Sequence, residues 1–243
     1  MSRIAVLSDI HSNLHALTAV WRRIEEIGID AVYCCGDVVG YGDRPVECLE
    51  MIRERGVTCV QGNHDALVAD GSLSLDFNIY SLAAVEHNRG LLNAEQLQWL
   101  ADLPTYHRLD REVLFVHGAP CDRDKYLVYL DDLQEASERV MNEDGPGVCF
   151  FGHTHHPVIF DGHGFERVRQ ATVTLEHGQR NLANPGSVGQ PRDNDPRSSF
   201  LWWDRSTNLL NYERVEYDVQ GARQDILDAD LPRILGDRLL EGR

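Results

Sequence analysis

Five short clusters of metal-capable side chains each follow directly on an apolar, strand-like run, and this repeated arrangement constrains the fold most. Aspartate, asparagine, glycine and histidine are common in turns, so turn chemistry explains any one cluster taken alone. Five of the eleven histidines lie in these clusters, however, where random placement would scatter them. Because the carboxyl ends of strands in an open α/β sheet share one ligand-binding edge, we expect the clusters to converge. They are Asp9-Ile10-His11, Gly36-Asp37, Gly62-Asn63-His64-Asp65, His117-Gly118 and Gly152-His153-Thr154-His155.

Strand-like and helix-like segments alternate through the first 150 residues and are followed by consecutive strands. We expect early strands at 4–7, 31–35, 58–60, 113–116 and 148–151, and helices near 14–27, 45–56, 79–92, 94–103 and 130–141. Later strands are expected at 158–160, 168–175, 181–183, 200–203 and 209–215, before a last helix near 219–240 that Pro232 interrupts. This order predicts an α/β (α+β) fold, a four-layer αββα sandwich of two packed mixed β-sheets flanked by helices. We expect residues 1–243 to form a single domain.

Composition narrows the classes of partner. The 243 residues include 39 acidic and 23 basic side chains, and the formal charge of −16 opposes binding to nucleic acid or anionic lipid. No apolar run approaches the ~18–20 residues that cross a bilayer, and the chain starts in a strand-like run without a signal-peptide core, so we expect a cytoplasmic protein with no membrane partner. Six scattered cysteines without a C-x-x-C pair indicate neither a disulfide framework nor a cysteine-zinc site.

The donor types in the clusters select a metal chemistry. Setting His64 and Asp65 aside leaves seven oxygen or imidazole donors and no thiolate, too many for one tetrahedral zinc ion. The set suits two borderline divalent ions such as Mn, Fe, Zn, Co or Ni. Two cations ~3.5–4 Å apart, bridged by a carboxylate, can hold the attacking and leaving oxygens of an in-line displacement at phosphorus. The donors are Asp9, His11, Asp37, Asn63, His117, His153 and His155.

In order and spacing, the five clusters resemble the five motifs of the calcineurin-like metallophosphoesterases. Residues 184–189 are also similar to the small bacterial and archaeal members of that superfamily, some of them related to diadenosine tetraphosphatases, so the resemblance covers nearly the whole chain. It implies a binuclear metal-dependent phosphoric ester hydrolase, with Mn favoured, that acts on a small phosphodiester or nucleotide-type substrate by in-line attack of a metal-bound hydroxide.

The resemblance also implies a role for each cluster residue. Asp37 would bridge the two ions. His64 would face the phosphoryl group, where it stabilises the transition state or protonates the leaving oxygen, and Asp65 would orient His64 or raise its pKa. One ion would be held by Asp9, His11, Asp37 and His155, and the other by Asp37, Asn63, His117 and His153.

Three further residues are candidates for contact with the substrate, each with an alternative structural role. Arg192 either binds phosphate oxygens or is an ordinary surface arginine. Asn13 either contacts phosphate or caps the first helix, and we favour the cap. Tyr41 either lines the pocket or is packed in the interior. Residues 66–78 form either a mobile edge of the pocket or a plain loop.

Two other functions and the oligomeric state stay open. A serine/threonine-type protein phosphatase or a phosphomonoesterase would use the same metal core, but residues 66–68 lack the arginine-bearing pattern of the protein phosphatases. An Fe(III)-tyrosinate site is not expected, because Gly40 occupies the tyrosine position of purple acid phosphatases. A protein-binding scaffold of this fold would lose donors, and none is lost. Apolar area on the second sheet or the last helix would allow a homodimer.

Overall fold

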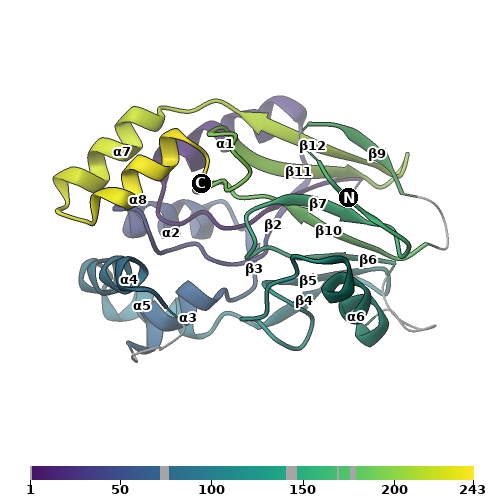
Figure 1. Ribbon diagram of the computed structural model, residues 1–243, viewed down its shortest axis with the longest axis horizontal. Coiled ribbons are helices and arrows are strands. Elements are labelled where there is room, and N and C mark those ends of the chain that lie inside the picture. Colours follow the sequence, from purple (N-terminus) through teal and green to yellow (C-terminus); the bar gives the residue numbers. More distant parts are fainter. Residues whose placement is uncertain (1, 72–76, 141–146, 169, 176–178) are drawn as a thin grey trace.

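Two six-stranded mixed sheets pack face to face in the computed structural model, which describes residues 2–71, 77–140, 147–168, 170–175 and 179–243 (Figure 1). The first sheet has the spatial order β3 (Thr58–Cys59), β2 (Ala31–Cys34), β1 (Arg3–Leu7), β11 (Ser198–Asp204), β12 (Leu209–Val215) and β9 (Thr172–Thr174). The second has the order β4 (Tyr106–Arg108), β5 (Val113–Val116), β6 (Val148–Phe150), β10 (Asn181–Pro185), β7 (Pro157–Phe160) and β8 (Phe165–Arg167).

Helices cover the outer faces of both sheets, which confirms the four-layer αββα sandwich (Figure 1). Within the described residues, α6 (Leu130–Val140) is the one helix that packs on the second sheet. The C-terminal helices α7 (Val219–Asp228) and α8 (Arg233–Asp237) and the 3₁₀ turn Arg238–Leu240 form a further small cluster beside α1. The first sheet is covered by α1 (Leu14–Ile27), α2 (Pro45–Glu54), α3 (Asn63–Asp70), α4 (Ile79–Leu91) and α5 (Ala94–Ala101).

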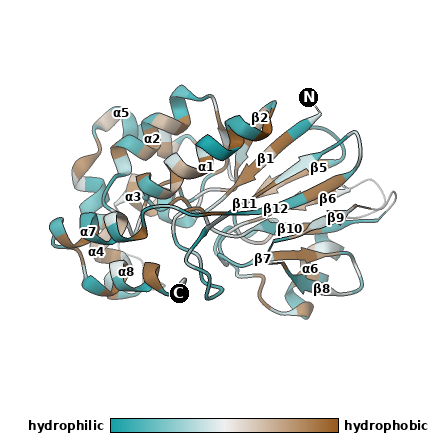
Figure 2. Cartoon of the chain, turned by 90° about the horizontal axis from the view of Figure 1, so that it is seen from above, coloured by the Kyte–Doolittle hydropathy of each residue, from teal (hydrophilic) through white to brown (hydrophobic). Residues whose placement is uncertain are grey.

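Strand β1 is apolar from Ile4 to Leu7 because both of its faces are buried there. Ala5 and Leu7 pack against the helices, whereas Ile4 and Val6 point into the space between the sheets. This alternation is the period of a strand, and burial on both sides explains why a continuous apolar run replaces the usual polar alternation. Figure 2 shows the hydrophobic colour on these inner strands and hydrophilic colour on the outer parts of the helices.

The parallel strands within each sheet have their carboxyl ends at the same edge. β1, β2 and β3 are mutually parallel, and so are β5, β6 and β10.

The late strands are divided between the two sheets. In the first sheet β11 pairs antiparallel with β1, with Trp203 opposite Ile4, and in the second sheet β7 pairs antiparallel with β10. A buried strand such as β1 needs backbone partners on both sides, and β2 and the late strand β11 supply them.

Several elements differ from the sequence expectation. The helix α3 and the edge strands β4 and β8 were not expected, and the strand expected at 168–175 is reduced to β9. In the segment expected as a loop or mobile edge, residues 66–70 belong to α3, while 72–76 lie outside the described residues. Edge strands of three residues carry too few side chains for a clear pattern. None of the helices in the described ranges combines the length and the apolarity needed to span a membrane.

Candidate metal centre

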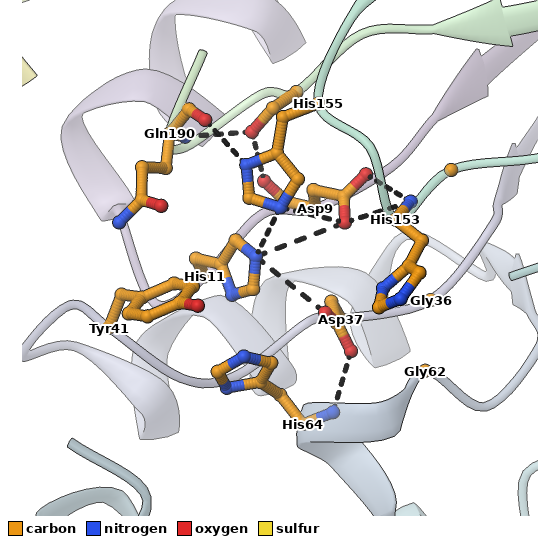
Figure 3. Close-up of polar contacts among 12 residues, drawn as sticks. Asp9, His11, Gly36, Asp37, Tyr41, Gly62, His64, His153, His155 and Gln190 are labelled. Atoms are coloured by element: carbon orange, nitrogen blue, oxygen red, sulfur yellow. Dashed lines mark hydrogen bonds and ion pairs between the residues drawn. The ribbon is translucent and has the colours of Figure 1, made fainter. Parts of the chain in front are cut away.

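The five clusters converge where strands of both sheets end. Figure 3 shows the side chains of four of them pointing toward a common space, namely Asp9, His11, Asp37, His64, His153 and His155. Six of the seven expected donors are buried, and Asn63 is half-buried. The donors follow β1 (Asp9, His11), β2 (Asp37), β3 (Asn63), β5 (His117) and β6 (His153, His155). The structure therefore brings together every residue expected to hold a metal ion, with both sheets contributing.

Most of the donors sit on strained backbone. A non-glycine residue in the left-handed region costs roughly 1–2 kcal/mol, and such residues persist where the surrounding structure holds them. Here the loop after β1 is held by hydrogen bonds to the loop after β2, from Asp9 N to Gly36 O and from His11 N to Asp37 O, each 3.0 Å. Positive φ angles occur at Asp9 (54°), His11 (50°), Asp37 (56°), His153 (65°) and His155 (60°).

The first donor group is formed by Asp9, His11 and His155. Nε2 of His11 lies 3.1 Å from Nε2 of His155, and Oδ1 of Asp9 lies 3.3 Å from Nε2 of His155. The second group is formed by Asn63, His117 and His153 beside Asp37. Nε2 of His117 lies 2.9 Å from Oδ1 of Asn63 and 3.2 Å from Nδ1 of His153. Three or four donors this close together can surround a single cation.

The outer nitrogen of each histidine fixes the protonation of the inner one. One nitrogen of each ring lies within hydrogen-bond distance of a backbone carbonyl oxygen, and this nitrogen donates its N–H to the carbonyl. The nitrogens of His11, His153 and His155 that face the centre then carry lone pairs, so the 3.1 Å contact between His11 and His155 sets lone pair against lone pair. A cation between them removes this conflict, and the residues therefore fit a metal ion. The carbonyl partners are Val39 for His11 (3.2 Å), Cys35 for His117 (2.7 Å), Asp124 for His153 (3.1 Å) and Gln190 for His155 (2.6 Å).

The charge states of these donors also suit metal binding. Burial favours the neutral acid at Asp9 and Asp37, but the facing imidazoles outweigh it and hold both pKa values below their usual range. Burial lowers the pKa of His153 to about 3 and lowers the pKa values of His11 and His155 as well. These donors are thus ionised carboxylates and neutral imidazoles, the forms that bind metals.

His117 is the exception among the histidines. Burial lowers its pKa, but the charges of Asp37 and Asp9 more than offset that effect and raise the pKa to about 9. Nε2 of His117 lies 3.4 Å from Oδ2 of Asp37. In the metal-free protein this ring therefore carries the proton that balances part of the negative charge of the two carboxylates.

Asp37 occupies the middle of the site and is held from several directions. Its Oδ2 also lies 3.6 Å from Nε2 of His11, so the carboxylate faces both donor groups. Its Oδ1 accepts a hydrogen bond from the backbone N–H of His64 (2.9 Å). A Cβ added to Gly62 would overlap this Oδ1, so only glycine leaves room for the carboxylate in this position.

His64 and Asp65 are both buried at the start of α3, but their expected relation is wrong. The Asp65 carboxylate accepts backbone hydrogen bonds from Asp37 (2.8 Å), Val39 (3.2 Å) and Gly62 (3.0 Å), so it braces the loops and does not orient the His64 ring. Burial and the charge of Asp37 raise the pKa of Asp65 to about 7. Adjacent residues on a helix point in different directions, which explains why the two side chains do not meet.

The pKa of His64 also moves opposite to expectation. Burial lowers it to about 4, and the attraction of Asp37 does not compensate. The ring packs against His11 and Tyr41 at centroid distances of 4.8 and 4.5 Å, and its Nδ1 has no hydrogen-bond partner among the described residues. His64 is therefore a neutral imidazole beside the donors rather than an imidazolium.

The three candidates for substrate contact have different positions. Asn13 is the N-cap of α1: its Oδ1 accepts from Ala16 N (3.1 Å) and its Nδ2 donates to Gly189 O (2.9 Å). Tyr41 is buried against His11 and His64, and its hydroxyl accepts a hydrogen bond from Nη2 of Arg192 (3.2 Å). The Arg192 guanidinium thus reaches the site through Tyr41.

A family model for the calcineurin-like phosphoesterase superfamily domain matches residues 2–208. The chain belongs to this superfamily. Membership, together with the clustered donors, indicates a hydrolase of phosphate esters that uses divalent metal ions.

Relatives of similar length support the assignment of this chain to the superfamily. An uncharacterized protein of Methanocaldococcus jannaschii is 38% identical over 250 residues, covering 100% of this chain and 99% of the relative. The crystal structure of a metallophosphoesterase from Sphaerobacter thermophilus has 33% identity and a TM-score of 0.87, covering 99% of both chains. A hypothetical protein from Pyrococcus horikoshii OT3, with 23% identity and a TM-score of 0.82, shares the fold over 100% of this chain and 99% of its own.

A pocket of about 290 Å³ opens beside the donors of the phosphoesterase, and it includes residues that sequence reasoning missed. Phe77 and Tyr126 contribute rings, and Arg123 contributes a guanidinium whose Nη1 donates to Oε1 of Gln61 (2.6 Å). Gln190 was also missed, although its carbonyl holds His155 and its Oε1 accepts from Arg192 (2.9 Å). Phe77 belongs to residues 66–78, the segment expected to form either an edge of the pocket or a plain loop, and described residues of that segment do line the pocket. The other three residues lie in irregular segments beyond the clusters, and only the closeness of Gln190 to residues 184–189 offered a signal.

Proposed function

We propose that this phosphoesterase holds two divalent metal ions and hydrolyses small phosphodiesters, including nucleotide-type esters. The observation that carries the proposal is the position of Asp37, whose Oδ2 faces His11 at 3.6 Å and His117 at 3.4 Å. A carboxylate shared by two donor groups suits a bridge between two cations. Oxygen and imidazole donors without thiolate favour Mn²⁺ and related borderline ions over a structural zinc ion.

Two such ions supply Lewis-acid stabilisation of the phosphoryl oxygens and lower the pKa of water at the site. The chain itself contributes His64 and Arg192. A neutral His64 ring donates one N–H to a phosphoryl oxygen, where it stabilises the charge that develops in the transition state. After burial, the positive charge of Arg192 is a leading influence that lowers the pKa of His155, and it also lowers the pKa of His64, so this guanidinium acts on the same space.

A diester is favoured over a monoester by the room beside the donors. The pocket of about 290 Å³ continues from Asn63, His64 and His153 toward α3 and α4, so a second ester substituent has a place to lie. The formal charge of −16 favours a small phosphorylated substrate over nucleic acid, because a polyanion would meet repulsion over most of the surface.

The test compares two esters with the same leaving group after reconstitution with Mn²⁺, Co²⁺, Ni²⁺ or Mg²⁺. We expect metal-dependent hydrolysis of bis(p-nitrophenyl) phosphate, a diester, with a higher kcat/KM than for p-nitrophenyl phosphate, a monoester. Asp37→Asn should lower the activity by about 10³-fold or more, because both ions depend on this carboxylate.

Asp230→Asn is the matched control, since Asp230 is exposed and has nearly the same backbone φ (54°) as Asp37 (56°). It should keep the activity. Absence of turnover in the reconstituted protein, or full activity in Asp37→Asn, would contradict the proposed function, and a clear preference for the monoester would contradict the assignment to diesters.

A further inference from the structure

The pocket beside the metal donors is unusually rich in rings. Tyr41, Phe77 and Tyr126 are three of its thirteen lining residues, whereas phenylalanine, tryptophan and tyrosine make up 8% of the chain. We propose that this pocket binds a planar aromatic group of the substrate, such as a nucleobase, by stacking on Tyr126, with Phe77 as a second apolar wall. The proposal rests on the proposed function and adds the class of the substituent that lies next to the reacting phosphate.

Tyr126 has the geometry of a stacking platform. One face of its ring is stacked on the imidazole of His153, with centroids 3.8 Å apart and an interplanar angle of 27°. The residue is nevertheless 47% exposed, so the ring still offers a surface to the pocket. His153 is itself fixed by the contact of its Nε2 with Asp124 O (3.1 Å). The platform is therefore rigid, and ordering it on binding costs little conformational entropy.

Phe77 contributes the other ring with accessible surface. It packs edge-on against His64 at a centroid distance of 4.8 Å and is half-buried, just before α4. Tyr41 is different, because it is 8% exposed and has the Arg192 guanidinium 5.6 Å from its ring centroid. Two rings from separate segments, one before α4 and one after β5, thus remain for the ligand.

Several polar side chains of the pocket already have hydrogen-bond partners, and two nitrogens without one among the described residues, Nε of Arg123 and Nδ1 of His64, are buried. Arg123 is held by Gln61 (2.6 Å) and lies 3.6 Å from the Asp124 carboxylate. Asn78 accepts hydrogen bonds from the first turn of α4, and Ser81 donates to the Tyr41 hydroxyl (3.3 Å). Recognition by ring faces is therefore favoured over reading of base edges, and we expect weak discrimination among bases.

The position next to His153 connects this pocket with the reaction. Nδ1 of His153 faces the second donor group, 3.2 Å from Nε2 of His117. When a ring stacks on the open face of Tyr126, the Tyr126 ring lies between that ring and the imidazole of His153. A phosphate at the donors and an aromatic ring on Tyr126 are thus separated by a short spacer, such as the sugar of a nucleotide.

The experiment measures competitive inhibition of bis(p-nitrophenyl) phosphate hydrolysis by two ligands that differ only in the base, AMP and ribose 5-phosphate. We expect AMP to bind at least about tenfold more tightly, the value of one base stacked on an aromatic side chain. The ratio of the two inhibition constants should fall below about threefold in Tyr126→Leu and persist in Tyr126→Phe, which keeps the ring. Quenching of 2-aminopurine riboside 5′-phosphate fluorescence on binding gives a second readout that does not depend on turnover.

Tyr129→Leu is the matched control, because Tyr129 is 73% exposed and does not line the pocket. It should keep the wild-type ratio. A ratio near one in the wild type, or an unchanged ratio in Tyr126→Leu, overturns the inference. Hydrolysis of the diester in the same assay separates the two failures: a protein that hydrolyses it without distinguishing the ligands refutes only the aromatic subsite, whereas one that hydrolyses no ester refutes the proposed function.

Discussion

At Gly62 a single added methyl group tests the geometry of the site. Its Cβ would overlap Oδ1 of Asp37, although the backbone there has no positive φ. Gly62→Ala should therefore weaken metal binding by about 10–100-fold, the usual effect of disturbing a group that supports a ligand. Gly90→Ala is the control, because a Cβ on Gly90 meets open space in α4 and alanine favours a helix. Equal metal affinities in the two variants would show that the Asp37 position is not critical.

The neutral state of His64 leads to a prediction for the pH–rate profile. With a pKa of about 4, the ring is deprotonated from pH 6 upward, and only about one molecule in a hundred carries the imidazolium at pH 6. His64→Gln should lower kcat by roughly 10²–10³-fold, as for loss of a hydrogen-bond donor to the transition state, without changing the shape of the profile between pH 6 and 8. A basic limb in this range that disappears in the variant would identify His64 as a general acid.

His117 links metal binding to a proton. Its pKa of about 9 means that the metal-free protein holds a proton on this ring at pH 7.5, and a bound cation must displace it. The apparent affinity for Mn²⁺ should therefore rise with pH below about 9, with release of about one proton per chain. Calorimetric titration in two buffers of different ionisation enthalpy measures this number, and it should drop in His117→Asn. Binding without proton release would contradict the assigned charge state.

At the scale of elements, substitution of Asn13 tests whether this residue has a structural role or a functional one. It caps α1, with Oδ1 accepting from Ala16 N, so Asn13→Ala should cost about 1 kcal/mol of unfolding free energy and leave KM unchanged. Asn93→Ala is the matched variant, since Asn93 caps α5 in the same way, accepting from Gln96 N (3.0 Å). Both should lose stability in denaturant titrations, and Asn13→Ala should lose more, because buried Asn13 also donates from Nδ2 to Gly189 O. A raised KM in Asn13→Ala alone would instead support the alternative role of Asn13 as a phosphate contact.

The sequence predicted the convergence of the candidate donors well because their positions follow from strand ends. Asp9, Asp37 and His117 each come directly after an apolar run, and parallel strands bring such positions to one edge. The helix α3 was not predicted, since it has no clear amphipathic repeat, and the relation between His64 and Asp65 that the resemblance implied took no account of this helix. Once residues 63–70 are helical, neighbouring side chains diverge by about 100°.

The walls of the pocket could be predicted only in part, for a different reason. Residues 66–78 were expected as a possible pocket edge, but nothing in the sequence singled out Phe77 in that segment. Tyr126 follows β5 in a segment without secondary structure, so no periodic pattern connects it with the donors. The proximity of Phe77 and Tyr126 depends on how the two sheets pack, because β5 belongs to the second sheet while α4 covers the first. Long-range packing of this kind leaves no local signal in the sequence.

At the scale of the whole molecule, the site joins the two sheets. Asp9 and Asp37 follow strands of the first sheet, whereas His117 and His153 follow strands of the second. Burying these donors together is unfavourable without a cation, because two carboxylates and several lone pairs face one another. The arrangement of the sandwich, and not any single loop, therefore determines how many ions the site holds and where they lie.

The central claim is that Asp37 lies between two bound cations, and anomalous diffraction from crystals grown with Mn²⁺ tests it most directly. The account predicts two anomalous peaks per chain, ~3.5–4 Å apart, on either side of the Asp37 carboxylate. One peak is expected beside Asp9, His11 and His155, and the other beside Asn63, His117 and His153. A single peak, or peaks remote from Asp37, would contradict the account.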